Sequence, residues 1–109
     1  MFKELTVMCD YGIDIPLWPD VGPALTYEQF KTLPLSATLK KRLLDWERLY
    51  EGTMDPFLEG DDLKNVEEAL DDVGIELVLA IKMALPDTKI YWFQERTNKT
   101  KEIVEGSTK

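Results

Sequence analysis

The chain carries few of the side chains that enzymes use at neutral pH. It has no histidine and a single cysteine, Cys9, which removes the usual general base, the commonest metal ligand and every Ser-His-Asp or Cys-His arrangement. The six glycines are scattered singly, so no glycine-rich loop is present to cradle a phosphate. Cys9 falls at an inward position of an expected strand, where a cysteine acts as a small apolar side chain. We therefore expect a protein that is not an enzyme and that binds no cofactor.

Carboxylates are the one reactive side chain that is abundant. Asp10 and Asp14 flank Tyr11 and could line a pocket as an acid/base pair, with Trp18 nearby. Asp10, Tyr11 and Trp18 thus define an alternative site for a small ligand or a sugar; the other interpretation is that Asp10 caps the turn after a strand. No metal site is expected, because the calcium-loop pattern D-x-[DN]-x-[DN]-G is absent from the next group of acids, Asp55, Glu59, Asp61 and Asp62.

The excess negative charge lies in the middle of the chain. The whole chain has a net charge of −8, and residues 47–76 alone hold eleven acids and two bases, Arg48 and Lys64. Seven of these acids fall in residues 61–76, with Lys64 as the only base among them. They are the candidate partner-binding residues: Asp61, Asp62, Glu67, Glu68, Asp71, Asp72 and Glu76.

The uniform sign of this segment has a cost on a helix. Like charges four residues apart, such as Glu67 with Asp71 or Glu68 with Asp72, each destabilise a helix by about 0.2–0.5 kcal/mol. Their retention suggests that the field has a use, and attraction of a positively charged partner is the simplest one. Direct nucleic-acid binding needs clustered Lys and Arg and is not expected. The alternative interpretation is a solvated face that keeps a small protein soluble.

One long helix, over residues 61–85, is expected to position these acids. At ~100° per residue its apolar residues share a face, made of Leu63, Val66, Leu70, Val73, Leu77, Ala80 and Ala84. The acids lie opposite, in the first half only. After Gly74 the helix is apolar all round, which is typical of a buried helix. We expect its second half to form the centre of the molecule, with Leu79 and Met83 either in the core or at the centre of an interface.

Further regular elements are predicted on both sides of this helix. Residues 3–9 and 89–94 predict strands, the first from its alternation and the second from its β-branched and aromatic residues. Residues 101–104 could add a third strand as a hairpin. Residues 37–51 predict a helix that Ser36 caps, with a solvent-facing side made of Lys40, Lys41, Asp45, Glu47 and Arg48.

The connecting segments carry their own signals. Residues 26–32 predict a single helical turn with a capping box between Thr26 and Gln29. The prolines of residues 14–23 exclude regular structure there, and we expect Trp18 to anchor this loop to the core. In the connector 53–60, Asp55-Pro56 predicts a turn, and the apolar pair Phe57 and Leu58 is expected to dock against the core.

Together these elements predict an α+β fold, a small two-layer sandwich in the order β-α-α-β(-β). Two main helices pack on one face of a two- or three-stranded sheet. We expect one domain over residues 1–109, with residues 105–109 as a frayed tail. No apolar run reaches the ~18 residues of a membrane span, the N-terminus lacks a secretory signal, and a lone cysteine agrees with a reducing compartment. A cytoplasmic monomer, or a weak homodimer through Tyr91, Phe93 or the sheet edge, is expected.

Several short motifs in the first half of the chain suggest a family. They are Asp10-Tyr11, Pro16-Leu17-Trp18 and Leu33-Pro34-Leu35-Ser36, followed by Leu39, Leu43 and Trp46. In these motifs, its size and its acidity the chain resembles the immunity proteins of polymorphic-toxin and contact-dependent inhibition systems. The resemblance implies a protein that neutralises a cognate toxin domain, often a basic nuclease, by binding it. A housekeeping interaction or dimerisation domain and a small-ligand protein remain the alternatives, and the acidic helix and the Pro-rich loop remain alternative interfaces.

Overall fold

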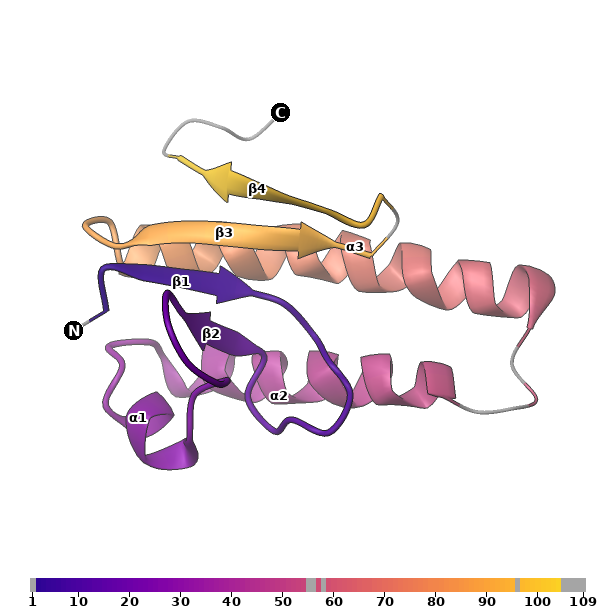
Figure 1. Cartoon of the computed structure of the whole chain (residues 1–109), viewed down its shortest axis with the longest axis horizontal. Helices are drawn as coiled ribbons and strands as arrows, with labels where there is room; N and C mark the ends of the chain where they lie inside the picture. The colour runs from indigo at the N-terminus through magenta and orange to yellow at the C-terminus, as the bar shows by residue number, and fades with distance from the viewer. Residues whose placement is uncertain (1, 55–56, 58, 96, 105–109) are drawn as a thin grey trace.

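A computed structural model describes residues 2–54, 57, 59–95 and 97–104. The predicted turn at residues 55–56, the docking of Leu58 and the frayed tail at residues 105–109 lie outside the described residues. Figure 1 shows the elements in chain order, which are β1 (Glu4–Val7), β2 (Leu17–Pro19), α1 (Tyr27–Lys31), α2 (Ala37–Glu51), the 3-10 turn η1 (Gly52–Met54), α3 (Gly60–Ala84), β3 (Lys89–Gln94) and β4 (Lys99–Ile103).

The sheet has the strand order β2-β1-β3-β4. The central strands β1 and β3 run parallel, with Leu5 opposite Ile90, and each carries an antiparallel strand on its outer side. Alternate residues point into the core, so that Leu5, Val7, Ile90 and Trp92 are buried. Because two parallel neighbours need a long crossover, the chain forms both main helices between β1 and β3. The predicted α+β sandwich is confirmed.

The prediction that residues 14–23 hold no regular structure is wrong. Leu17–Pro19 pairs with β1 as an edge strand, which gives the sheet four strands instead of two or three. Proline lacks the N–H that an interior strand needs, but an edge strand bonds on one side only. The carbonyl oxygen of Pro16 accepts from the N–H of Met8 at 3.1 Å, and that of Leu17 accepts from Leu25 at 2.9 Å.

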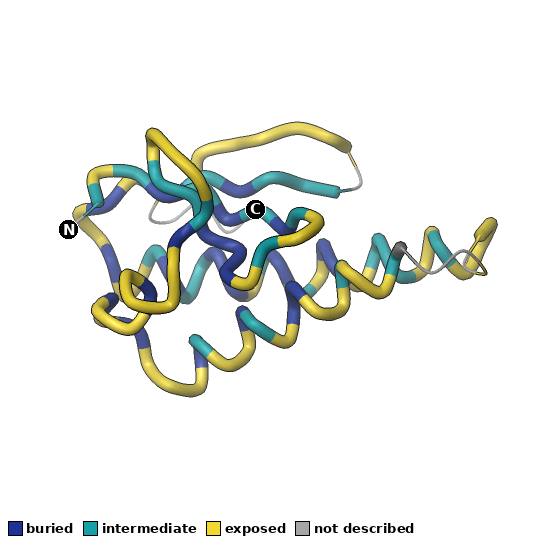
Figure 2. Tube along the Cα trace, turned by 60° about the horizontal axis from the view of Figure 1, so that its bottom comes forward, coloured by how far each residue is buried: buried dark blue, intermediate teal, exposed yellow. Residues whose placement is uncertain are grey.

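The helices begin where their capping residues predict. The Oγ of Ser36 accepts from the N–H of Leu39 at 3.0 Å at the start of α2, and Thr26 and Gln29 form the predicted capping box of α1. α2 and α3 pack on each other, and α3 also lies against β3. The first turns of α3 extend beyond the sheet, where Figure 2 shows mostly exposed and half-buried residues.

Gly74 allows α3 to approach the core closely. A Cβ at this position would lie 3.0 Å from Trp92 Nε1 and 3.1 Å from Trp46 Cζ2. The Nε1–H of Trp46 donates to the carbonyl oxygen of Leu70 at 2.9 Å, which ties α2 to α3. Cys9 is buried, as predicted.

The structure corrects two further predictions of burial. Met83 is 81% exposed and Leu79 is half-buried, because α3 packs through one side only. That side is made of Leu70, Asp71, Gly74, Leu77, Val78 and Ile81. Phe57 does not dock against the core; it is 89% exposed. No helix in the described part of the chain is long and apolar enough to cross a membrane.

Candidate binding surface

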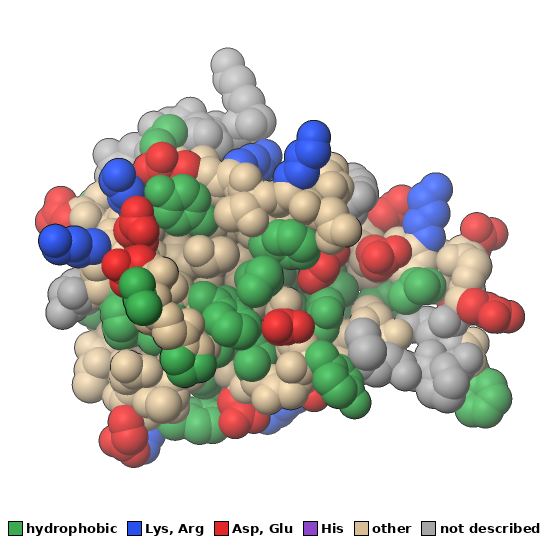
Figure 3. Space-filling model, viewed as in Figure 1, with side chains coloured by type: hydrophobic (Ala, Val, Ile, Leu, Met, Phe, Trp, Pro, Cys, Tyr) green, Lys and Arg blue, Asp and Glu red, His purple; other side chains and the backbone are tan. Residues whose placement is uncertain are grey.

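The predicted acidic residues lie mainly on the outer side of α3. We define the acidic side of α3 as Asp61, Asp62, Glu68, Asp72 and Glu76, of which Glu68 is half-buried and the other four are exposed. Glu67 is also half-buried, and it lines a cleft together with Glu95, the residue that follows β3. Figure 3 shows acidic side chains at the end of the molecule that projects beyond the sheet, with basic atoms among them.

Little positive charge offsets this side within the described residues. The Nη2 of Arg42 lies 3.6 Å from the Oε1 of Glu76, with the two side chains 44% and 64% exposed. An exposed pair of this kind contributes about 0–1 kcal/mol. Lys64 is also exposed on α3, so the acidic side of α3 presents a predominantly negative field to the solvent.

Asp71 is not part of this exposed side, contrary to the prediction. It is 6% exposed, and its Oδ1 accepts from the backbone N–H of Glu95 at 2.9 Å. The reason lies in the helix period, which places residue 71 in line with Gly74, Val78 and Ile81. Asp71 thus holds the end of β3 to α3.

A second group of carboxylates lies where the parallel strands β1 and β3 end. Asp10 follows β1, Glu95 follows β3, and Glu47 comes from α2. The prediction that Glu47 faces solvent is wrong: it is 2% exposed, because the chain after β1 covers it. Its Oε1 accepts from the N–H of Asp10 at 3.2 Å, and its Oε2 has no hydrogen-bond partner in the described part of the chain. We call Asp10, Glu47 and Glu95 the carboxylate cluster.

The cluster changes the acidity of its members. Burial raises the pKa of Glu47 to about 8, with the adjacent Glu51 adding to the effect. Burial and then the charges of Asp71, Glu67 and Asp10 raise the pKa of Glu95 to about 7. The pKa of Tyr50 is also raised, by burial and by the charges of the cluster. Burial raises the pKa of the Cys9 thiol as well, so this cysteine is a poor nucleophile.

A cleft of about 240 Å³ opens beside the cluster. We call it the carboxylate cleft. Apolar walls and acidic groups alternate around it, in a lining made of Tyr50, Thr53, Leu63, Glu67, Leu70 and Glu95. Sequence reasoning missed this site because its lining residues come from α2, η1, α3 and the end of β3, which only the tertiary fold brings together.

Asp10 and Trp18, two residues of the alternative ligand site, form hydrogen bonds that hold the chain after β1. The Oδ1 of Asp10 accepts from the N–H of Tyr11 at 2.8 Å, which caps the turn after β1. The Nε1–H of Trp18 donates to the carbonyl oxygen of Met8 at 3.0 Å, which anchors the loop, and Tyr11 is exposed. A cavity of about 360 Å³ in this loop is lined by residues 12–15 and 23–27, which include none of the three.

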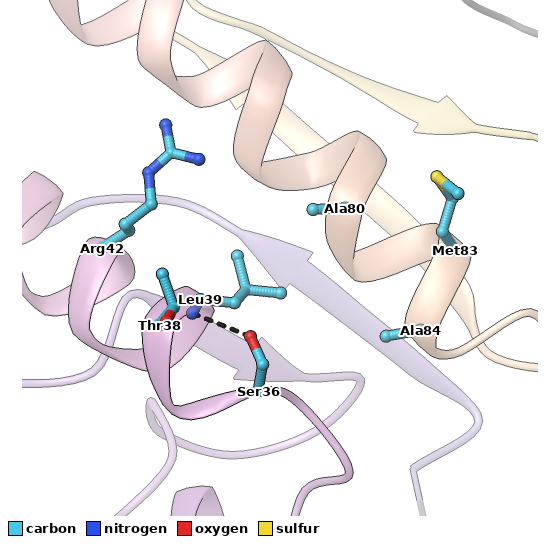
Figure 4. Close-up of a pocket in the computed structure, with 7 residues that line it drawn as sticks. All are labelled: Ser36, Thr38, Leu39, Arg42, Ala80, Met83 and Ala84. Atoms are coloured by element: carbon cyan, nitrogen blue, oxygen red, sulfur yellow. Dashed lines mark hydrogen bonds between the residues drawn. The ribbon is translucent and has the colours of Figure 1, made fainter.

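A shallow groove of about 500 Å³ lies between the start of α2 and the end of α3, away from both acidic groups. Figure 4 shows its lining residues on the two facing helices, Ser36, Thr38, Leu39, Arg42, Ala80, Met83 and Ala84. Two of its polar side chains are engaged, since Ser36 caps α2 and Arg42 pairs with Glu76. Among the described residues no three His, Cys, Asp or Glu side chains are placed to hold a metal ion.

Comparison with protein families gives a match over most of the chain. Residues 3–95 match the model of a family described as Serratia CdiI immunity protein-like. This range runs from before β1 to the end of β3 and includes both acidic groups. No curated protein matches the chain in sequence.

Proposed function

Because the chain belongs to the Serratia CdiI immunity protein-like family, we propose that it neutralises a basic, nuclease-like toxin domain through the acidic side of α3. Family membership supports neutralisation by binding. The observation that carries the choice of surface is the predominantly negative exposed charge on α3, toward the end of the helix that extends beyond the sheet.

A basic partner would complement the charge of the acidic side of α3. A domain that cleaves nucleic acid needs Lys and Arg to hold phosphates, and such a surface is attracted to a row of carboxylates. Complementary charge raises association rates and excludes wrong partners. The same carboxylates repel phosphates, so the protein does not bind nucleic acid itself. Without histidine or a reactive thiol, it acts as a non-catalytic cytoplasmic inhibitor.

The experiment begins with capture from a lysate of the native host at low and high salt, with mass spectrometry of the retained proteins. The captured toxin domain is then purified, and its toxic activity and affinity are measured with the wild type and with Glu68→Lys/Asp72→Lys. We expect equimolar wild type to abolish the activity. We expect the variant to bind at least ~10-fold more weakly, since reversing charges at a charged interface costs more than ~1.4 kcal/mol.

A matched variant separates the two possible interfaces. Asp14→Lys/Asp20→Lys changes the net charge equally, but in the exposed Pro-rich loop. It should bind like the wild type. If it loses affinity while the helix variant keeps it, the interface is the loop and the assignment to α3 is wrong. Light scattering on the free protein should report a monomer, and a stable dimer would favour an interaction domain instead.

A further inference from the structure

The carboxylate cleft has the composition of a site for a cationic side chain. Tyr50, Leu63 and Leu70 give it apolar walls, while Glu67 and Glu95 bring carboxylates from α3 and from the end of β3. Thr53 is fixed at its edge, since its hydroxyl donates to the carbonyl oxygen of Tyr50 at 2.6 Å. Apolar walls suit methylene groups, and carboxylates suit a charged end group.

The negative charge at this site is not matched within the described part of the chain. None of the ion pairs found there involves Glu47, Glu67 or Glu95. Glu47 is buried and does not line the cleft, so the carboxylates that a ligand meets there are Glu67 and Glu95. The charges of both Glu47 and Glu95 act on Tyr50, which lines the cleft. Two half-buried carboxylates of one sign, set among apolar walls and outside the ion pairs of the described residues, favour a positive group from outside.

The shape of the site selects among cations. Among the described residues no three His, Cys, Asp or Glu side chains are placed to hold a metal ion, and the apolar walls favour a cation with a carbon stem. A guanidinium is planar, presents several N–H donors to carboxylates on different sides, and stacks on an aromatic ring such as that of Tyr50. An ammonium group is a smaller point charge and uses such a cleft less fully.

We propose that the carboxylate cleft receives one arginine side chain of the toxin domain, held between Glu67 and Glu95 and against Tyr50. The proposal rests on the proposed function and adds a division of labour to it. The exposed acidic side of α3 accelerates association, whereas the half-buried contact in the cleft slows dissociation.

The binding of arginine should depend on pH. Arginine stays charged, whereas Glu95, whose pKa is about 7, must ionise. The groups that face Glu95 are Asp71 and Glu67 from α3, Asp10 after β1 and Tyr50 from α2. Since the cation favours the ionised carboxylate, affinity should rise by up to about tenfold from pH 6 to pH 8.

The test uses acetyl-arginine methylamide as the probe and its neutral citrulline analogue as the control, in NMR titrations of the full chain. We expect saturable chemical-shift changes at Tyr50, Thr53, Leu63 and Glu95. The dissociation constant should lie in the ~mM range for so small a ligand. Citrulline should cause none of them. The lysine analogue should bind more weakly. Shifts spread evenly over the acidic side of α3, or none in the cleft, would overturn the proposal.

Variants then separate this proposal from the proposed function. Glu67→Gln/Glu95→Gln should weaken arginine binding about tenfold, remove its rise with pH and speed the dissociation of the toxin domain. Asp14→Asn/Asp20→Asn, with the same charge change, should alter none of these. If the Gln variant keeps the wild-type dissociation rate while Glu68→Lys/Asp72→Lys loses toxin affinity, the cleft proposal fails and the proposed function stands. If no toxin domain binds the wild type, the proposed function fails, and the arginine titration still decides whether the cleft is a cation site.

Discussion

The acidic side of α3 and the carboxylate cluster use the same side chains in opposite environments. On α3 the carboxylates are mostly exposed and solvated. In the cluster, Glu47 is buried, Glu95 is half-buried, and both have raised pKa values. The first group faces the solvent, so its field acts on a partner that approaches within about a Debye length, ~10 Å at 0.1 M salt. The second group is held by the fold, so its charge changes with pH and affects stability.

The number of acids in a segment of the sequence does not identify the role of each one. Adjacent acids of α3 lie in different environments, since Asp71 is buried and accepts from the backbone N–H of Glu95, a member of the cluster, while Asp72 is exposed. One step along a helix turns a side chain by ~100°, which here separates a structural contact from a surface charge.

The largest expected effect is the loss of a buried acceptor. Asp71→Ala leaves the N–H of Glu95 without its acceptor and should lower the free energy of unfolding by about 1–3 kcal/mol. Asp71→Asn keeps the Oδ1 and should lose less. Asp72→Ala, one residue along, should stay within ~0.5 kcal/mol of the wild type. Urea unfolding at pH 7 measures all three, and equal losses at positions 71 and 72 would remove the distinction between the two groups.

The next effect is a pH dependence confined to the buried group. The pKa of Glu47 is raised in the folded state, so the folded state holds this proton more tightly than the unfolded state. Its contribution is therefore present at low pH and is lost as the pH rises toward about 8. Glu47→Gln cannot ionise, and should be more stable than the wild type at pH 8 by at least ~1.4 kcal/mol.

Thermal unfolding at pH 5 and pH 8 measures this difference. At pH 5 the two proteins should be nearly equal, because Glu47 is protonated in the folded state. Glu68→Gln, on the acidic side of α3, serves as the control and should show the same small change at both pH values. If Glu47→Gln gains no stability over the wild type at pH 8, then Glu47 ionises without cost and the distinction between the two groups is lost.

The smallest expected effect on stability comes from the exposed group. Glu68→Lys/Asp72→Lys should change the free energy of unfolding by no more than ~0.5 kcal/mol, because surface substitutions away from packed contacts rarely do more. Chemical unfolding checks this value and also validates the binding experiments. A loss of several kcal/mol would mean that these side chains support the fold, and that their reversal says little about a partner.

The parts of the fold that could be predicted from the sequence depend on local signals. Ser36, Thr26 and Gln29 mark helix starts through hydrogen bonds within three residues. The helix over residues 60–84 follows from its periodicity, and the strand at Lys89–Gln94 from its composition. The acids of α3 were also found in this way, because a run of one charge is visible in the chain.

The parts that could not be predicted depend on tertiary contacts. β2 forms beside two prolines because it lies at the edge of the sheet, and no local signal reports which strand lies at an edge. Glu47 is buried because the chain after β1 crosses the end of α2. A weak signal existed, since Glu47 lies four residues after Leu43 and next to Trp46, on the apolar stripe of its helix. The charge of Glu47 favours a solvent-facing position, whereas its place in the helix favours burial.

Steering by the acidic side of α3 is tested most directly by stopped flow. The association rate constant of the toxin domain is measured with wild type and with Glu68→Lys/Asp72→Lys, at ~0.05 M and ~0.5 M salt. If the acidic side of α3 steers the partner, wild type associates at least ~10-fold faster at low salt than at high salt, and the variant associates slowly with little dependence on salt. Equal rates and equal salt dependence for the two proteins would contradict the claim that the acidic side of α3 steers the partner.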